Sequence, residues 1–197
     1  MYAAATDRAA IPPCVYPIDY LTFGGMCRAV SLRSVPHNFI ENIFVQPKEV
    51  LSAAPSVDVH CYLQISEATR QPLTLNVELL DGEKVIARGT QRITTVTVAE
   101  EPAEYTVAIE KLQGIGLWDL QNPKLYHARV TLQQGAQTLD QETRRFGFRE
   151  AVFTKEGFHL NGKVIKLRGL DRRQTFPFVG QAMSGRAHRR DAQILSQ

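Results

Sequence analysis

The sequence has few of the residues that would give a chain of this size its own chemistry. Its 197 residues include three cysteines, Cys14, Cys27 and Cys61, with no Cys-x-x-Cys pair and no histidine at metal-ligand spacing. An odd, scattered set of thiols argues against a disulfide framework and fits reduced cysteines in the cytoplasm. A nucleophile-elbow serine, a phosphate-binding glycine loop and a zinc-ligand cluster are also missing.

The chain also lacks an excess of charge of one sign and any long hydrophobic run. Lys and Arg number 23 and Asp and Glu number 20, a balance that indicates neither nucleic acid nor an acidic membrane as a partner. The one dense basic stretch, residues 186–190, is closed by Asp191 and is interpreted as a solvated helix face. Residues 1–10 lack a signal-peptide pattern, and no run of 18 apolar residues could cross a membrane.

Short alternating strands are abundant between residues 37 and 148. Leu73, Leu75, Val77 and Leu79 alternate with polar residues, as a strand with one buried face requires, and Asp81-Gly82 then predicts a hairpin turn. Strands of this kind, separated by turn residues, are typical of a β-sandwich. The expected strands cover residues 39–45, 57–66, 73–80, 84–87, 92–98, 105–109, 125–133 and 138–146.

The only tryptophan, Trp118, lies in the tract 117–126. Its ring can bury a large apolar area beside a loop whose turn is fixed by Pro123, so we assign it to packing rather than to stacking on a sugar. His60 and His127 fall inside strand patterns without a partner at ligand spacing. Each is interpreted as a strand or core residue.

The segment 157–173 predicts a tight hairpin followed by a buried strand with charged residues at its end. Apolar residues alternate before Asn161-Gly162, a strong hairpin signal, and an apolar run resumes at residues 164–170. Residues 171–174, Asp-Arg-Arg-Gln, follow that run directly. Barrel enzymes place their chemistry at the carboxyl ends of strands, but pattern alone favours a solvated strand end, since charged residues are mostly exposed.

Three motifs together resemble family 2 glycoside hydrolases, in the β-galactosidase branch. Residues 157–180 match the pattern G-F-x-L-N-G-x-x-x-x-L-R-G-x-N-R-H-x-x-x-P-x-x-G at most of its positions, including Pro177 and Gly180. Residues 117–126 resemble the L-W-x-x-x-N-P-x-L-Y signature of these enzymes. Residues 18–30 resemble I-D-Y-L-T-Y-G-G-I-Y-R-E-V. The resemblance covers nearly all of the chain.

The resemblance implies a mainly β chain in three sections. Residues 1–36 would be the end of a jelly-roll sugar-binding domain, and residues 37–148 an immunoglobulin-like β-sandwich. Residues 149–197 would be the first hairpin, strand and helix of a (β/α)8 TIM barrel, with Ser184 as the N-cap of the helix. A whole barrel takes about 250 residues, so this last section is expected to be truncated.

The resemblance also implies two sugar-contacting residues. Asp19 matches the aspartate that extends into the galactose pocket and commonly helps to hold a sodium ion; without the family it would be interpreted as a turn residue. Arg173 stands where a histidine usually contacts the galactosyl group, and Asp171 stands where the family usually has Asn. An arginine could reach sugar hydroxyls, but it cannot reproduce a neutral imidazole. Arg172 is expected to be structural or to support the residues that contact the sugar.

A member of this branch is expected to be a homo-oligomer that hydrolyses terminal β-galactosides with retention, using two glutamates and often magnesium and sodium. Glu150 and Glu156 precede the barrel strand and match neither glutamate motif, so no catalytic residue is predicted. We therefore expect this chain to be inactive alone and to require no cofactor itself. Two alternatives stay open. One is a non-catalytic sandwich module that packs, oligomerises or binds carbohydrate weakly; the other is a sister activity such as β-glucuronidase or β-mannosidase.

The last section also predicts exposed apolar surface. An isolated hairpin and barrel strand would leave several large side chains without cover, at a cost of several kcal/mol by the usual value of about 25 cal/mol per Å². A flexible or self-associating section is therefore expected. The side chains concerned are Phe158, Leu160, Ile165, Leu167 and Leu170.

Overall fold

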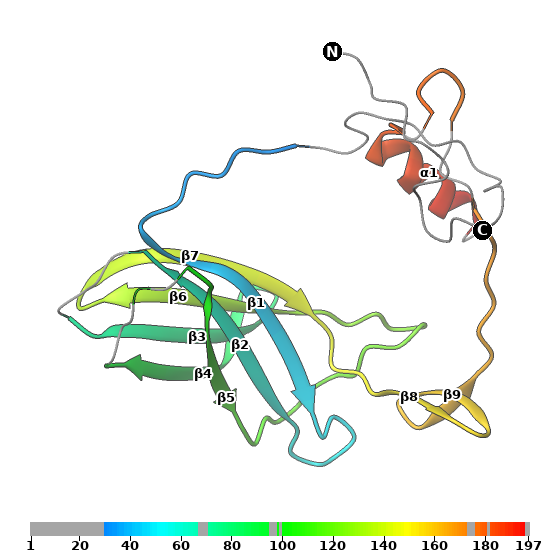
Figure 1. Ribbon diagram of the computed structural model, residues 1–197. Coiled ribbons are helices and arrows are strands. Elements are labelled where there is room, and N and C mark those ends of the chain that lie inside the picture. The colour runs from blue at the N-terminus through cyan, green and yellow to red at the C-terminus, as the bar shows by residue number, and fades with distance from the viewer. Residues whose placement is uncertain are drawn as a thin grey trace. The chain divides into compact units, whose positions relative to one another are not determined.

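The computed structural model describes residues 30–66, 71–94, 98, 100–172, 176–180 and 182–195. The chain divides into two units, one formed by Ser34–Leu167 and the other by Met1–Arg33 with Arg168–Gln197. The predicted mainly β character is confirmed, since the described residues form ten strands and one helix (Figure 1). In chain order these are β1 (Asn38–Lys48), β2 (Ser56–Ile65), β3 (Leu73–Asp81), β4 (Lys84–Ile93), β5 (Ala103–Ile109), β6 (Tyr126–Gln134), β7 (Gln137–Phe146), β8 (Ala151–Thr154), β9 (Gly157–Leu160), β10 (Lys163–Ile165) and α1 (Gly185–Leu195).

The first seven strands form two antiparallel sheets that stack as a β-sandwich. One sheet has the order β1-β2-β5 and the other the order β4-β3-β6-β7. Figure 1 shows the two sheets as separate layers. The predicted turn joins β3 to β4, with Asp81 opposite Lys84 and Gly82 in the left-handed region at a φ of 61°, which glycine adopts without strain.

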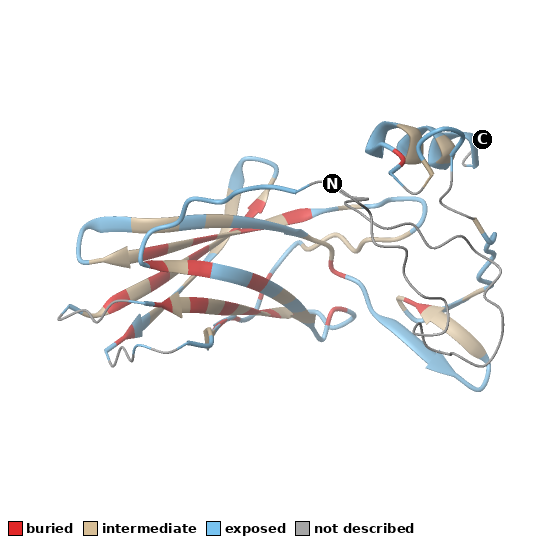
Figure 2. Cartoon of the chain, turned by 45° about the horizontal axis from the view of Figure 1, so that its top comes forward, coloured by how far each residue is buried: buried red, intermediate tan, exposed pale blue. Residues whose placement is uncertain are grey.

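The core of the sandwich follows from side-chain alternation. Every second residue of β2, β3 and β6 is buried, which Figure 2 shows as red bands along these strands. The predicted inward set of β3, including Leu75 and Val77, is confirmed at 1% exposure or less. Phe148, just after β7, closes one end of the core with its ring edge-on to Tyr126 at 5.3 Å between centroids. Burial of each such side chain contributes roughly 1.5–3 kcal/mol.

Strand β4 corrects the prediction of two separate strands at 84–87 and 92–98. It is continuous from Lys84 to Ile93 and runs through Gly89, opposite Val77. A Cβ at Gly89 would lie 2.7 Å from Cγ1 of Val107 and 2.8 Å from Cγ1 of Ile109, both on β5. The glycine therefore marks close contact between the two sheets and does not break the strand.

Strands β8, β9 and β10 form a small third sheet in the order β10-β9-β8. The predicted hairpin is confirmed, with Lys163 opposite Leu160 across Asn161-Gly162, whereas β8 was missed. The expected exposure of Leu160 is wrong, since it is 5% exposed, and Phe158 is half-buried beneath Phe153 at 5.0 Å between ring centroids. The additional strand covers part of the hairpin.

The predicted buried strand at 164–170 is also corrected. Strand β10 ends at Ile165, and residues 166–172 have no regular structure. Among the described residues no strand pairs with this segment, and an extended segment without a hydrogen-bonded neighbour is not a strand of a sheet. Leu167 and Leu170 are 62% and 76% exposed, as expected for them.

In the other unit, the described residues after Arg168 contain helix α1. It begins directly after Ser184, as predicted, and the Ser184 carbonyl accepts the first helical hydrogen bond, from the Ala187 amide at 3.0 Å. Arg186, Arg189 and Arg190 are exposed, which confirms the solvated basic face. No helix in the described ranges is long and apolar enough to cross a bilayer.

Candidate functional site

The two predicted sugar contacts, Asp19 and Arg173, lie outside the described residues. Arg172, directly before Arg173, is described and is engaged by helix α1. Its Nε donates to Oδ2 of Asp191 at 3.0 Å, its Nη2 also reaches that oxygen, and its Nη1 lies 3.1 Å from Nδ1 of His188. These contacts fit the structural role, which is one of the two roles predicted for Arg172. Asp191, interpreted as the end of a solvated face, is instead the partner of Arg172.

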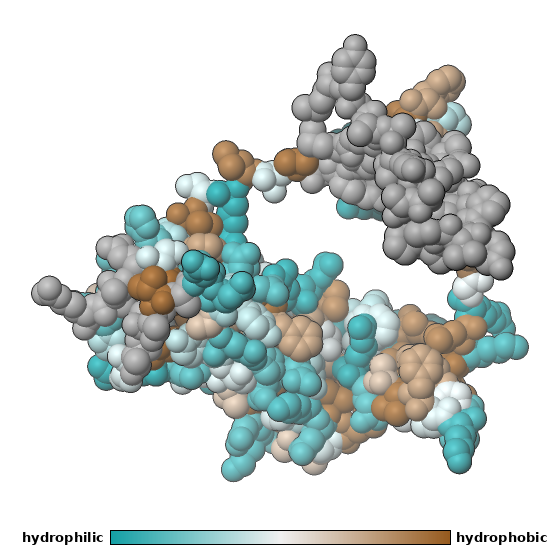
Figure 3. Space-filling model, in the orientation of Figure 1, coloured by the Kyte–Doolittle hydropathy of each residue, from teal (hydrophilic) through white to brown (hydrophobic). Residues whose placement is uncertain are grey.

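A groove opens in the larger unit between residues 117–121 and the hairpin of β9 and β10; we call it the hairpin groove. Its wider part has a volume of about 540 Å³ and includes Leu120, Leu160 and Ile165. A neighbouring hollow of about 270 Å³ shares these three residues and adds the ring of Trp118. Figure 3 shows brown, hydrophobic surface over β8 and β9 at this end of the unit. The lining of the groove contains both apolar and polar side chains.

Trp118 stands at one wall of this groove and packs as predicted, although its ring is half-buried. The Arg149 guanidinium lies 4.9 Å from the ring centre, a cation–π contact. A Cβ at Gly147 would lie 3.0 Å from Cβ of Trp118, so Gly147 permits the close approach. The Trp118 amide donates to the Phe148 carbonyl at 2.8 Å, which ties the tract to the end of the sandwich.

Asn161 joins the hairpin to the sandwich, a role that the sequence did not reveal. Its Nδ2 donates to the Trp118 carbonyl at 2.9 Å, and its Oδ1 accepts from the Glu150 amide at 3.0 Å. Its own amide donates to the Glu150 carbonyl at 2.9 Å. Asn161 has a φ of 49°, a conformation that Asn tolerates better than most residues. The Asn-Gly turn predicted a hairpin but not its attachment.

The lining of the groove includes one carboxylate whose charge is fixed by the backbone. Asp119 Oδ1 accepts from the amides of Gln121 and Asn122, each at 2.8 Å. These two hydrogen bonds, from Asn122 first and then Gln121, lower the pKa of Asp119, and the charge of Lys163 lowers it further. Asp119 therefore remains ionised, and it organises the turn that ends at Pro123.

Glu156, next to the hairpin, does not have the electrostatics of a general acid. The Thr154 hydroxyl, which donates to Glu156 Oε2 at 2.6 Å, is the main cause of a lowered pKa for Glu156. A glycosidase acid requires a raised pKa, so Glu156 is unsuited to that role. In the described ranges, no group of three His, Cys, Asp or Glu side chains is arranged to hold a metal ion.

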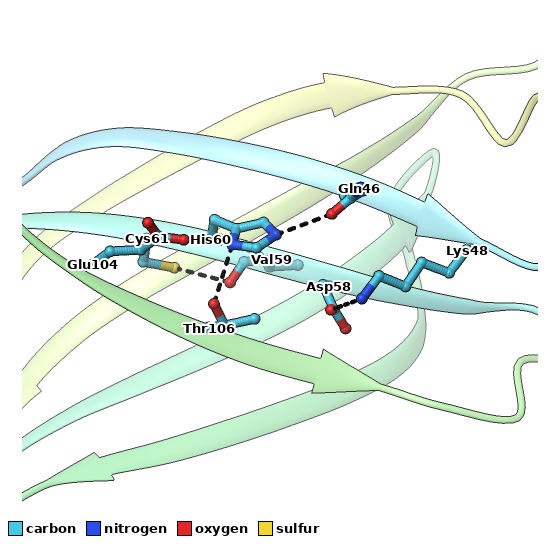
Figure 4. Close-up of polar contacts among 8 residues, drawn as sticks. All are labelled: Gln46, Lys48, Asp58, Val59, His60, Cys61, Glu104 and Thr106. Carbon is cyan, nitrogen blue, oxygen red and sulfur yellow. Dashed lines mark hydrogen bonds and ion pairs between the residues drawn. The ribbon is translucent and has the colours of Figure 1, made fainter. Parts of the chain in front are cut away.

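The outer face of the sheet β1-β2-β5 carries a polar cluster around His60 (Figure 4). His60 Nδ1 lies 2.7 Å from Oε1 of Glu104 and 3.1 Å from the hydroxyl of Thr106, and Nε2 lies 3.3 Å from Oε1 of Gln46. Phe44, 55% exposed, lies beside the imidazole at 5.9 Å between ring centroids. His60 is thus a strand residue, as predicted, but it lies outside the core. These contacts link β1, β2 and β5 across the sheet.

The neighbouring Cys61 points the other way, into the core. Its thiol is buried, and burial raises its pKa to about 12. A thiol with this pKa is not a nucleophile at neutral pH. Its sulfur donates to the Val59 carbonyl at 3.7 Å, so Cys61 acts as a core residue.

The sheets and the groove show which class of protein this is: a β-sandwich module with an additional hairpin sheet attached at one end. The family model for glycosyl hydrolases family 2 matches residues 38–149. The chain therefore belongs to glycosyl hydrolase family 2. The family match covers the sandwich and ends at Arg149, beside Trp118.

Individual relatives agree with this assignment. A protein of Thermoanaerobacterium thermosulfurigenes named Beta-galactosidase is 38% identical over 193 residues, which are 97% of this chain and 26% of that protein. A Beta-galactosidase of Rhizobium meliloti is 34% identical, over 93% of this chain and 24% of its own. A protein of Formosa agariphila named Putative beta-glucuronidase is 28% identical over 90% of this chain and 21% of its own.

Solved structures of the family have the same fold. A glycosyl hydrolase family 2 member from Bacteroides cellulosilyticus matches with a TM-score of 0.78 and 28% identity, over 89% of this chain and 23% of that one. A beta-glucuronidase of Bacteroides uniformis, covalently bound to cyclophellitol-6-carboxylate aziridine, matches with a TM-score of 0.80 and 25% identity, over 96% and 23%. The chain thus spans about a quarter of the length of the relatives that it matches.

Proposed function

We propose that this chain functions within a retaining β-galactosidase that releases terminal, non-reducing β-D-galactose. The observation that carries the proposal is its identity of 38%, 34% and 31% to three proteins named Beta-galactosidase, in each case over at least 93% of the chain. Family membership by itself supports only the coarser statement that the protein is a glycosidase. The sandwich and its hairpin sheet would be the accessory part that precedes a catalytic barrel, and the complete enzyme would be a cytoplasmic homo-oligomer.

β-Glucuronidase is a second candidate, because a protein named Putative beta-glucuronidase is 28% identical and a solved beta-glucuronidase is 25% identical to this chain. These identities are lower than the 38% of the first β-galactosidase. A glucuronide differs from a galactoside by a carboxylate, which needs a cationic partner in the sugar site. Arg173 could supply such a charge, so substrate preference has to be measured and not assumed.

The chemistry proposed for the enzyme is double displacement. One glutamate attacks the anomeric carbon while the other protonates the leaving oxygen, and the second then activates water; the two carboxyl groups lie about 5–5.5 Å apart. We assign neither glutamate to this chain, since Glu150 and Glu156 match no family motif. Asp19 and Arg173 are proposed as contacts to the galactosyl hydroxyls.

Magnesium and sodium supply no step in this proposal. The described residues offer no group of three ligands to a metal ion, and the sodium contact implied for Asp19 concerns a residue outside them. A sodium ion held by Asp19 would orient the sugar because a hydroxyl oxygen of the sugar would coordinate it. Its role is tested by replacing sodium with lithium or choline during the assay below.

The test is hydrolysis of 4-nitrophenyl β-galactoside, β-glucuronide and β-mannoside at equal concentrations. One sample is the 197-residue chain, and the other is the protein encoded by the complete reading frame that contains this sequence. We expect no turnover by the chain alone and the highest kcat/KM on the galactoside for the complete frame. Arg173→His, which restores the usual family residue, should lower KM for the galactoside.

Higher kcat/KM on the glucuronide would overturn the galactosidase proposal in favour of the sister activity. No hydrolysis of any of the three glycosides by a folded product of the complete frame would favour the non-catalytic module. Turnover by the 197-residue chain alone would mean that the catalytic pair has been assigned wrongly. A sample whose far-ultraviolet circular dichroism matches that of a β protein serves as the control for folding.

A further inference from the structure

Asn161 is the one asparagine of this sequence that is followed by glycine. The others, Asn38, Asn42, Asn76 and Asn122, precede phenylalanine, isoleucine, valine and proline. A backbone amide nitrogen can attack the side-chain carbonyl carbon of a preceding asparagine, and a glycine leaves that nitrogen unhindered because it has no side chain. The attack closes a small ring and needs only that the two atoms approach in the right direction. Asn161 is therefore the asparagine of this chain most prone to deamidation.

The turn that contains this pair leaves the attacking nitrogen free. Lys163 pairs with Leu160 across the turn, so the ladder of β9 and β10 does not use the Gly162 amide. Asn161 and Gly162 have φ values of 49° and 75°, the positive pair that a two-residue hairpin turn requires. Gly162 is exposed, and a Cβ there would be in ordinary contact with Cδ1 of Leu51 at 3.8 Å. The nitrogen is therefore neither used by the ladder nor enclosed by tight packing.

The side chain of Asn161, by contrast, is held from both ends. Its Nδ2 donates to the Trp118 carbonyl at 2.9 Å, and its Oδ1 accepts from the Glu150 amide at 3.0 Å. A nitrogen that attacks Cγ turns this planar carbon tetrahedral, which moves Nδ2 and Oδ1 out of line with both partners. The two hydrogen bonds must therefore break before the ring closes. The reaction proceeds from a locally opened hairpin, and its rate is the intrinsic rate multiplied by the opening equilibrium.

We propose that Asn161 is a site of spontaneous deamidation, and that this reaction loosens the hairpin sheet from the sandwich permanently. The nitrogen of Gly162 forms a bond to Cγ of Asn161 and gives up its proton. The bond between Cγ and Nδ2 breaks, and Nδ2 leaves as ammonia with that proton. Water then opens the resulting succinimide at either carbonyl, which gives aspartate or isoaspartate at position 161.

Neither product restores the contact with Trp118. An ionised carboxylate accepts hydrogen bonds but donates none, so an oxygen in place of Nδ2 would face the Trp118 carbonyl oxygen with no proton between them. Isoaspartate also adds one carbon to the backbone of the turn, whose two-residue geometry allows no extra length. Opening of the hairpin is thus reversible before the reaction and irreversible after it.

The contact that is lost joins the two sides of the hairpin groove. Trp118 belongs to one side and Asn161 to the other, and the Nδ2 hydrogen bond connects them. Its loss should let the half-buried ring of Trp118 become more accessible to solvent. The main core of the sandwich ends at Phe148, so we expect the sandwich itself to stay folded. Trp118 is the only tryptophan, and its fluorescence therefore reports this change alone.

The first experiment measures conversion at position 161. The folded 197-residue chain and a synthetic peptide with the sequence of residues 157–166 are incubated side by side at neutral pH, and peptide mass spectrometry quantifies aspartate and isoaspartate. We expect both products, and conversion in the chain about tenfold to hundredfold slower than in the peptide, because opening limits it. Equal rates would show that the two hydrogen bonds do not protect Asn161. No conversion of the chain once the peptide is fully converted would overturn the site.

The second experiment tests the dependence on opening. Phe153→Ala removes the ring that lies 5.0 Å from Phe158 between centroids and should weaken the hairpin sheet. Phe44→Ala makes the same change at a phenylalanine that is 55% exposed on the outer face of the sandwich, and it is the control. Conversion at Asn161 should be about twofold to tenfold faster in Phe153→Ala, by the usual contribution of an aromatic pair. It should be unchanged in Phe44→Ala, and equal rates in both variants would overturn the dependence.

The third experiment tests the loosening itself. Chain converted at position 161 is separated by its additional negative charge and compared with unconverted chain from the same incubation. Hydrogen exchange of the peptide covering β9 and β10 should be about tenfold faster in the converted chain, as expected for one lost hydrogen bond. Acrylamide should also quench Trp118 more strongly, while exchange of β3 should not change. Converted and unconverted chains that behave alike in both measurements would overturn the loosening.

Discussion

The sandwich and the described part of the unit with helix α1 are held together by different interactions. The largest fully buried side chains, among them Leu75, Val130 and Phe148, all belong to the larger unit. In the described residues of the other unit, Met183 is buried and α1 has no buried residue. There the side chains of Met183, His188 and Asp191 all contact Arg172. The larger unit is stabilised by apolar burial from both sheets, whereas the contacts of Arg172 with Asp191 and His188 in the described part of the other unit are polar.

This difference shows that alternating apolar residues specify a core when two sheets face each other. Two facing sheets bury each other's apolar residues, and this term is large because it scales with the area removed from water. Helix α1 has no buried residue, and among the described residues of its unit no sheet faces it. An isolated helix of this length depends on tertiary contacts. The same comparison predicts that substitutions of equal size will have unequal effects in the two units.

The largest expected effect is that of Leu75→Ala on the central strand β3. Leu75 is fully buried between the two sheets, so we expect the free energy of unfolding to fall by about 2–5 kcal/mol. Leu170→Ala, at a position that is 76% exposed in the other unit, should change it by less than about 0.5 kcal/mol. Urea unfolding followed by Trp118 fluorescence measures both, and equal losses would remove the distinction between the units.

The next largest loss of stability is expected for a substitution of Gly89. Gly89→Ala would place a Cβ 2.7 Å from Val107 and should cost about 1–3 kcal/mol by overpacking. Gly185→Ala, at the first residue of α1 with no atom within 4 Å of the new Cβ, should be neutral or stabilising by less than about 1 kcal/mol. Thermal unfolding reports both variants. A tolerated Gly89→Ala would mean that the sheets can separate slightly at little cost.

The attachment of the hairpin to the sandwich should have an intermediate effect. Asn161→Asp keeps the acceptor for the Glu150 amide but replaces the donor to the Trp118 carbonyl with an oxygen, at a cost of about 1–2 kcal/mol. Gln121→Glu makes the same chemical change at an exposed residue of the same groove and is the control. Exchange of the peptide covering β9 and β10 should accelerate in the first variant and not in the second. If both behave alike, Asn161 does not attach the hairpin.

The smallest expected effect on the free energy of unfolding is that of Glu78, on the outer face of the sandwich. Hydrogen bonds from Arg129 and then Arg88 lower the pKa of Glu78. Because the folded pKa is below the unfolded one, this contribution is complete above the ordinary glutamate value of about 4.3 and is lost as the pH falls through the folded pKa. For a pair at the surface it should be under about 1 kcal/mol.

This pH dependence can be isolated with Glu78→Gln. The variant should be slightly less stable than wild type at pH 7, and the difference should shrink as the pH falls through the lowered pKa of Glu78. Urea midpoints at pH 7, 5, 4 and 3 make the comparison. A difference that persists at the lowest pH would show that the amide disturbs packing and that the charge contributes little.

The strands of the sandwich were predictable because their signal is local. In β2, β3 and β6 the sequence alternates with the period of two that a half-buried strand imposes, and the turn at Asp81-Gly82 has its own chemistry. The same reasoning failed for β4, which was predicted as two strands at residues 84–87 and 92–98 but is continuous through Gly89. A glycine alone does not say whether it bends a strand or admits a neighbour from another sheet.

The candidate site was less predictable. The motif around residues 157–180 pointed to the family, but the partners of Arg172 lie 16 and 19 residues away, and Asn161 holds a carbonyl 43 residues away. No periodicity connects such positions. The Asn161-Gly162 pair indicated a tight turn, yet it identified neither Trp118 nor Glu150 as a partner of Asn161.

The sequence by itself determined that the chain is mainly β, where most sandwich strands lie, where the hairpin and α1 begin, and the family to which it belongs. Only the tertiary structure decided that β10 ends at Ile165, that Gly89 lies against β5, and that Arg172 is clamped by α1. The physical reason is that these two kinds of information depend on different separations along the chain. Strand alternation and turn chemistry act between residues a few positions apart, whereas steric contact and directed hydrogen bonds depend on where distant elements meet.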